Sequence, residues 1–237
     1  IVGGGNARAG AWPWSVSLQF RQAGAHFAHV CGGVLVNEYS VLTAAHCVTG
    51  RKDPYSWRAV LGVHNLRKHG AHAAKRSIKS ITVHPGFQRE TLENDIALFE
   101  LDPAVRYSDY IQPICLPSRL PPLADNQTAC FISGWGRTSE KGKASAVLKE
   151  AQVEIIPSSI CNHPDVYRVM VNSNMICAGS WSGGTDTCQG DSGGPLACYY
   201  PGANRFHLLG IASFGIGCGR PHLPGVYVRL SQYRTWI

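Results

Sequence analysis

Residues 187–195 read Thr-Cys-Gln-Gly-Asp-Ser-Gly-Gly-Pro, a stretch that sets Ser192 among glycines and next to the acid Asp191. Taken alone, it is typical of a surface loop, because glycine and proline mark turns. A serine hydroxyl is also a poor nucleophile at neutral pH, and it attacks a carbonyl carbon only when a nearby base takes its proton. A catalytic interpretation of Ser192 therefore requires a base elsewhere in the chain.

Two earlier stretches supply a histidine and a second acid. Residues 42–47, Leu-Thr-Ala-Ala-His-Cys, contain His46, and residues 94–98, Asn-Asp-Ile-Ala-Leu, place Asp95 just before an apolar run. Each alone has an ordinary explanation, namely a histidine in a satisfied hydrogen bond and an acid at a turn. Together, in the order His, Asp, Ser, the three stretches resemble the chymotrypsin-like (trypsin-fold) serine proteases, and the resemblance covers essentially the whole chain.

The composition independently favours an all-β chain. The 237 residues are 44% hydrophobic and include 26 glycines and 14 prolines, which leave little room for long helices. No apolar run approaches the length of a membrane span. Helical turns are expected to begin near 44–47 and 158–161. Short β-rich runs bounded by turn residues, which indicate a sandwich or barrels, recur at 16–20, 32–36, 59–63, 78–83, 96–101, 129–133, 151–156, 194–197, 206–212 and 225–229.

The resemblance implies a more specific fold than periodicity does. It predicts two six-stranded antiparallel β-barrels with the active site in the cleft between them, and a C-terminal helix that begins in residues 231–237. Residues 1–237 then form one trypsin-like (peptidase S1) catalytic domain made of two barrel halves. Within the family, residues 10–14 (Gly-Ala-Trp-Pro-Trp) and 131–138 (Phe-Ile-Ser-Gly-Trp-Gly-Arg-Thr) are most similar to acrosin and transmembrane serine protease 12.

The catalytic roles follow from the resemblance residue by residue. His46 takes the proton of Ser192 and later returns it to the leaving amine, while Asp95 holds the imidazole in the correct tautomer. The backbone N–H groups of Gly190 and Ser192 map to the oxyanion hole. These assignments imply a serine endopeptidase.

The first residues of the chain match the family's activated terminus. The chain opens Ile-Val-Gly-Gly, and the resemblance pairs the ammonium of Ile1 with the carboxylate of Asp191. We therefore expect the enzyme to be made as a zymogen and activated by cleavage before Ile1. Breaking such a buried pair costs about 3–5 kcal/mol, enough to explain an inactive precursor.

Specificity is predicted from the resemblance as well. Asp186 falls where trypsin-like members place the acid at the floor of the primary pocket, so cleavage is expected after Arg or Lys; the alternative is a surface acid in a glycine-rich loop. Gly215 and Gly225 map to the pocket walls. Ser213, Phe214 and Gly215 match the segment that pairs with the substrate backbone, although the family usually carries Trp where this chain has Phe214.

Nine cysteines point to an oxidising compartment. The odd number leaves at least one free or bonded outside the chain. The resemblance assigns that role to Cys115, as the link to the cleaved propeptide chain, with a buried free thiol as the alternative. It pairs the others as Cys31–Cys47, Cys130–Cys198, Cys161–Cys177 and Cys188–Cys218.

The chain carries seven more basic than acidic side chains, 22 Lys and Arg against 15 Asp and Glu. Basic residues gather at 66–69, 75–79 and 141–143, which are either solvated loops or a surface for sulfated glycans and other polyanions. Nucleic acid is not expected, since no known binding module accompanies the charge. The sequon at Asn126 fits an extracellular or granule glycoprotein, tethered to a membrane if the propeptide carries an anchor.

Metal ions and cofactors are not expected. Pro224 stands where sodium-responsive members carry an aromatic residue, and residues 65–76 lack the carboxylates of calcium-binding members. The expected partners are peptide substrates and serine protease inhibitors. The rival hypothesis is a non-catalytic member of the fold that binds a receptor or glycan. A lipase or esterase is not expected, because the order His46, Asp95, Ser192 differs from the Ser, Asp or Glu, His order of those enzymes.

Overall fold

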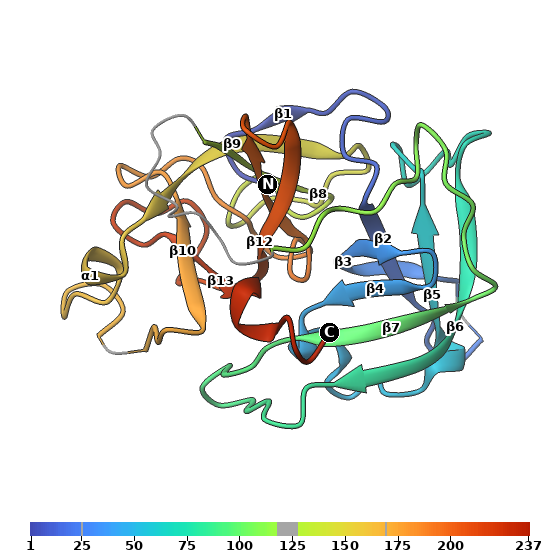
Figure 1. Cartoon of the computed structure of the whole chain (residues 1–237), viewed down its shortest axis with the longest axis horizontal. Coiled ribbons are helices and arrows are strands. Elements are labelled where there is room, and N and C mark those ends of the chain that lie inside the picture. Colours follow the sequence, from blue (N-terminus) through green and yellow to red (C-terminus); the bar gives the residue numbers. More distant parts are fainter. Residues whose placement is uncertain (25, 118–127, 169) are drawn as a thin grey trace.

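The computed structural model describes residues 1–24, 26–117, 128–168 and 170–237. Most of the regular structure is β-strand, and the two halves of the chain lie side by side (Figure 1). Each half closes into an antiparallel six-stranded barrel, so the predicted fold is confirmed. In the described part of the chain, no helix has the length and apolar character of a membrane span.

The first barrel closes in the order β2-β3-β4-β7-β6-β5. Its core contains fully buried apolar side chains such as Val16, Leu42 and Phe99, as expected for strands that turn one face inward. Its strands are β2 (Ser15–Phe20), β3 (Ala28–Asn37), β4 (Ser40–Thr43), β5 (Trp57–Leu61), β6 (Ala74–Val83) and β7 (Ala97–Asp102).

The second barrel closes in the order β8-β9-β10-β13-β12-β11, because β8 pairs with both β9 and β11. The short strand β1 (Gly5–Asn6) adds to β9 at its edge and brings the start of the chain onto this half. The barrel strands are β8 (Ala129–Gly134), β9 (Lys149–Ile156), β10 (Met175–Gly179), β11 (Pro195–Tyr200), β12 (Arg205–Phe214) and β13 (Gly225–Arg229).

An aromatic cluster joins the two barrels. The ring of Trp12, in the segment between β1 and β2, lies 5.3 Å from the rings of both Phe131 on β8 and Phe206 on β12. Aromatic rings at this separation bury much apolar area in a favourable geometry. The cluster therefore fixes the first barrel against the outer face of the second.

The helical segments are short, as the turn-rich composition predicts. They are η1 (Ala45–Val48), η2 (Pro54–Ser56), α1 (Ser158–Cys161) and η3 (Leu230–Tyr233). The expected C-terminal helix is present as the 3₁₀ helix η3, after which the N–H of Ile237 bonds the carbonyl of Tyr233 in an α-helical step.

The sequence did not predict two of the barrel strands, β4 and β10. β4 is four residues long and follows β3 through a tight turn, so it offers too few positions for an alternating pattern. All five residues of β10 are buried, so its sequence lacks alternation altogether. The strands β4 and β10 are therefore defined by hydrogen bonds to other strands of their barrels, and not by an alternating pattern in their own sequences.

Candidate active site

A cavity of about 720 Å³ is lined by residues of both halves of the chain. The first half contributes His46, Thr49, Arg89 and Leu92. The second half contributes Asp186, Thr187, Cys188, Gln189, Ser192, Ala212, Ser213, Phe214, Gly215, Gly217, Cys218, Glu140 and Lys141. Residues from the histidine stretch and from the serine stretch therefore meet at one cavity, as expected of a site between the barrels.

His46 and Asp95 meet because the strands that carry them are neighbours. His46 lies on η1, just after β4, and Asp95 lies just before β7, which pairs antiparallel with β4. The Nδ1 atom of His46 is 2.7 Å from Asp95 Oδ2, and the backbone N–H of His46 donates to Oδ1 at 2.8 Å. Since a carboxylate only accepts hydrogen bonds, Nδ1 carries the proton and Nε2 is left as an acceptor.

Ser213 makes a contact that the sequence did not indicate. It was expected only in the segment that pairs with the substrate, yet its hydroxyl donates to Asp95 Oδ2 at 2.7 Å. Asp95 is fully buried and accepts hydrogen bonds from one residue of each barrel. A buried carboxylate that accepts hydrogen bonds on both oxygens is held in place. Asp95 therefore fixes the orientation of the His46 imidazole.

Ser192 lies in the turn before β11, and Gly190 precedes it with φ +95°, a conformation that favours glycine. Within the residues that the structure describes, the N–H groups of Gly190 and Ser192 donate to no acceptor. Ser192 lines the cavity and Gly190 lies two residues before it, and an oxyanion hole requires such free amides. No hydrogen bond joins Ser192 Oγ to His46 Nε2 in the described part of the chain. Such bonds are often long without substrate.

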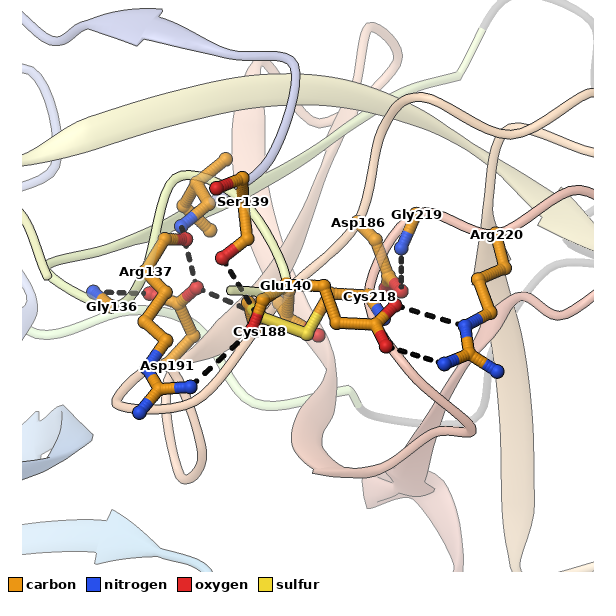
Figure 2. The surroundings of a disulfide bond; sticks show 12 residues. Gly136, Arg137, Ser139, Glu140, Asp186, Cys188, Asp191, Cys218, Gly219 and Arg220 are labelled. Atoms are coloured by element: carbon orange, nitrogen blue, oxygen red, sulfur yellow. Dashed lines mark hydrogen bonds and ion pairs between the residues drawn. A yellow bond between two sulfur atoms is a disulfide. The ribbon is translucent and has the colours of Figure 1, made fainter. Parts of the chain in front are cut away.

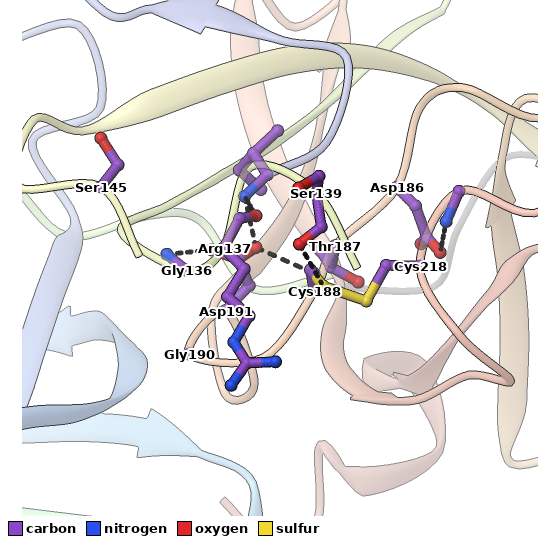
Figure 3. A network of polar contacts seen from close by, with 12 residues as sticks. Gly136, Arg137, Ser139, Ser145, Asp186, Thr187, Cys188, Gly190, Asp191 and Cys218 are labelled. Carbon is purple, nitrogen blue, oxygen red and sulfur yellow. Dashed lines mark hydrogen bonds and ion pairs between the residues drawn. A yellow bond between two sulfur atoms is a disulfide. The ribbon is translucent and has the colours of Figure 1, made fainter. Parts of the chain in front are cut away.

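Asp191 points away from the cavity and meets the start of the chain. Its Oδ2 atom lies 2.6 Å from the Ile1 ammonium, and both side chains are fully buried. The same carboxylate accepts the N–H of Cys188 at 2.9 Å and that of Gly136 at 2.8 Å (Figure 3). The ammonium also donates to the carbonyl of Arg137 at 2.9 Å. The predicted pair is therefore formed, and it anchors the turn between Cys188 and Ser192.

His29 is a second side chain that sequence analysis missed. Its Nε2 atom is 2.8 Å from the carbonyl oxygen of Gly190, and its Nδ1 is 2.7 Å from Ser17 Oγ. Burial lowers the pKa of His29, which favours the neutral ring. The neutral ring then donates through Nε2 and fixes the peptide at Gly190. No motif surrounds His29 in the sequence, so no local signal identifies it.

Asp186 lines the cavity and is buried, with 3% of its surface exposed. Its Oδ2 atom accepts the N–H of Gly219 at 2.9 Å, whereas Oδ1 has no hydrogen-bond partner among the described residues. Burial raises the pKa of Asp186 to about 7, against the opposing effect of the Gly219 and Thr187 amides. Its backbone pairs with Val2, next to the buried terminus. An unpaired oxygen at this depth is suited to a cationic ligand.

The predicted wall residues take different positions. Gly215 lines the cavity, while Gly225 is not part of that lining and lies next to the acid, where a Cβ would come within 2.8 Å of Asp186 Oδ1. Phe214 lines the cavity and packs edge-on against Tyr167, with ring centroids 6.0 Å apart. The hydroxyl of Tyr167, which the sequence did not single out, accepts the N–H of Ile216 and so supports this wall.

Four disulfides form among the described residues, and they join the four pairs that the resemblance implies. Cys188–Cys218 ties the serine stretch to the pocket wall, and Figure 2 shows the residues around it. Cys115 is half-buried and lies outside these pairs, with its sulfur 4.0 Å from an Arg205 nitrogen. Asn126 lies outside the described residues.

Two closed antiparallel barrels that share one cavity are the architecture of the chymotrypsin-like serine proteases. The sequence model of the family described as Trypsin matches residues 1–237. The chain therefore belongs to the trypsin family, and it is a serine endopeptidase. Membership also implies protein substrates and protease inhibitors as partners.

Proposed function

We propose that this endopeptidase cleaves peptide bonds after Arg or Lys and becomes active when a cut before Ile1 frees its ammonium. One observation carries the specificity: a buried carboxylate, Asp186, ends the cavity that His46 and Ser192 also line, and one of its oxygens is unpaired in the described part of the chain. A guanidinium or ammonium group satisfies that oxygen, whereas an apolar side chain leaves it unpaired.

In the proposed mechanism, Ser192 Oγ attacks the carbonyl carbon as His46 Nε2 takes its proton. His46 then gives this proton to the leaving amine, and water hydrolyses the acyl-enzyme with His46 again as the base. Asp95 stabilises the transient imidazolium through its 2.7 Å contact with Nδ1. The free amides of Gly190 and Ser192 donate to the oxyanion.

Activation follows from the environment of Asp191. Without the Ile1 ammonium, its buried carboxylate lacks a counter-charge, and removing one partner of a buried pair costs about 3–5 kcal/mol. We infer that the precursor relieves this cost by turning Asp191 out of its site. The Gly190–Ser192 turn, and with it the oxyanion hole, is lost in that state.

The finer assignments are also proposals. We propose that Cys115 forms a disulfide with the propeptide chain and that Asn126 is glycosylated. We also propose that the enzyme acts outside the cell or in secretory granules, where it is either free or tethered to a membrane through the propeptide chain. The segments 10–14 and 131–138 favour kinship with acrosin and transmembrane serine protease 12.

A binding function is the second candidate, and a basic groove favours it. The groove, of about 490 Å³, is lined by Arg21, Arg58, Lys75, Arg76 and Lys79, and the Arg58 guanidinium lies 4.5 Å from the ring centre of Phe27. Such a surface suits a sulfated glycan. The free amides near Ser192 favour catalysis as the main function, with the groove as an accessory site.

Titration with an arginine-directed acylating agent distinguishes the two functions. An active protease is labelled stoichiometrically at Ser192, whereas a binding protein is not labelled. Asp186→Ser tests the specificity separately: we expect it to abolish cleavage after Arg and Lys while an uncharged sulfonyl fluoride still labels Ser192. Asp165→Ser, on the exposed loop after α1, is the control. Retained preference for basic residues in Asp186→Ser would refute the assignment.

A further inference from the structure

An ion pair joins two of the loops that line the pocket. Glu140 lies in the loop between β8 and β9, and Arg220 lies in the loop between β12 and β13. Arg220 Nε donates to Glu140 Oε2 at 2.9 Å, and Nη2 contacts Oε1 (Figure 2). This two-pronged geometry restricts both side chains more than a single contact does. The pair therefore joins two loops that no strand pairing connects.

Glu140 also holds the wall directly. Its Oε2 atom accepts the N–H of Cys218 at 3.1 Å, and the next N–H, that of Gly219, donates to Asp186 Oδ2 at 2.9 Å. Consecutive amides of one short segment thus bond two carboxylates, that of Glu140 from the loop between β8 and β9 and that of the buried Asp186. The hydrogen bonds to Arg220 and Cys218 lower the pKa of Glu140 to about 2, so Glu140 is charged at neutral pH.

The wall needs such a restraint because glycines flank Cys218. Gly217 and Gly219 have φ of +67° and +71°, and glycine gains conformational freedom from its missing side chain. A Cβ on Gly217 would lie 2.3 Å from Arg220 Nε and 2.6 Å from Glu140 Oε2, so the ion pair lies directly against this backbone. The Cys188–Cys218 disulfide fixes one side chain of the segment and leaves its amides free to turn.

The same loop reaches back to the buried terminus. The carbonyl of Arg137 accepts a hydrogen bond from the Ile1 ammonium at 2.9 Å, and Arg137 Nη1 donates to the carbonyl of Glu140 at 3.3 Å. Residues 137–140 therefore contact the ammonium at one end and the pocket wall at the other.

We propose that Glu140 is a positioning residue that, together with Arg220, clamps the Gly217–Gly219 wall against Asp186 and so determines the affinity of the pocket for basic side chains. The inference rests on the proposed function, because it assigns Asp186 to the pocket floor. Glu140 does not contact the reacting atoms. Its loss is expected to raise KM and leave kcat almost unchanged, since Ser192 and His46 keep their contacts.

The test compares Glu140→Gln, Arg220→Met and the double variant with Asp165→Asn. The last removes the charge of an exposed acid on the loop after α1, 3.6 Å from His163 Nδ1, and serves as the matched control. The measurements are kcat and KM on a peptide substrate with arginine before the scissile bond, and Ki for benzamidine. Labelling of Ser192 by an uncharged sulfonyl fluoride reports whether each variant is folded and reactive.

Each single variant is expected to raise KM and the benzamidine Ki by about three- to tenfold, with kcat within about twofold of the wild type. Because the two residues act as one unit, the double variant should be no weaker than the weaker single variant. The proposed role of Glu140 and Arg220 would be refuted by unchanged KM and Ki, by a fall in kcat alone, or by fully additive effects of the two substitutions. Failure of the wild type to cleave after arginine would refute the proposed function instead, which separates the two failures.

Discussion

The two halves of the site are held by different means. The base region, which comprises His46, Asp95 and η1, is built where β4 and β7 pair, and Ser213 on β12 adds one hydrogen bond to Asp95 from the second barrel. The nucleophile region, residues 186–193, is a run of turns whose central contact is with Ile1, 190 residues away along the chain. Strand pairing supports the first region, whereas the second takes its counter-charge from the terminus, in addition to hydrogen bonds from Gly136 and His29. We therefore expect the proposed zymogen control to act mainly on the nucleophile region.

The largest expected effect comes from breaking the base region. His46→Ala removes the general base, and kcat should fall by about 10²- to 10⁴-fold. The nucleophile region does not depend on His46, so Ki for benzamidine should stay within about twofold of the wild type. Steady-state kinetics and inhibitor titration check both values. A large loss of benzamidine binding would mean that the two regions are not separately supported.

Breaking the nucleophile region should affect both measurements. Asp191→Asn leaves the Ile1 ammonium without its counter-charge, at a cost of about 3–5 kcal/mol, so kcat/KM should fall by at least about 100-fold. Benzamidine should bind more weakly as well, because Asp186 pairs with Val2 beside the terminus. Asp53→Asn, an exposed acid at the start of η2, is the control. Normal kinetics in Asp191→Asn would contradict the comparison.

The ionisation of Asp186 should make the Ki for benzamidine depend on pH, and this effect is of intermediate size. Burial raises the pKa of Asp186 to about 7, so its carboxyl group is neutral below that pH and charged above it. Benzamidine stays cationic over this range and needs the charged form. Its Ki should therefore increase by about tenfold for each pH unit below 7 and level off above it. Asp186→Asn should remove the dependence. A Ki that is constant from pH 8 to pH 5 in the wild type would exclude the raised pKa.

The ionisation of Asp186 should also change the stability of the folded state with pH. Because the folded pKa of Asp186 lies above its ordinary value, stability is greatest at low pH with respect to this group and is lost as pH rises through about 7. Asp186→Asn keeps the side chain neutral. Its melting temperature, relative to the wild type, should therefore rise between pH 4 and pH 8, and a constant difference would contradict the ionisation.

The smallest effect concerns His29, which connects β3 of the first barrel to Gly190. His29→Phe loses the hydrogen bond to the Gly190 carbonyl, and kcat/KM should fall by about two- to tenfold. His29→Gln keeps an N–H donor and should retain more activity. Equal losses in both variants would show that packing, rather than this hydrogen bond, supports the turn.

Prediction from the sequence succeeded where short motifs are specific. The stretches around His46, Asp95 and Ser192 indicated the family, and through it the two barrels. It failed where a contact depends on distant segments. The hydroxyl of Ser213 reaches Asp95 across the barrels, and nothing near Glu140 in the sequence reveals that its partner is Arg220. Such pairs arise from tertiary packing, which neither composition nor periodicity encodes.

The direct test of the central claim is a chain with one alanine added before Ile1. The addition moves the ammonium away from Asp191 and changes no other side chain. The measurement is kcat/KM on an arginine substrate, with the low-field NMR signal of the His46 Nδ1–H proton as the report on the base region. We predict a loss of at least about 100-fold with the proton signal retained. Unchanged kcat/KM would contradict the claim that the Ile1 ammonium supports the nucleophile region.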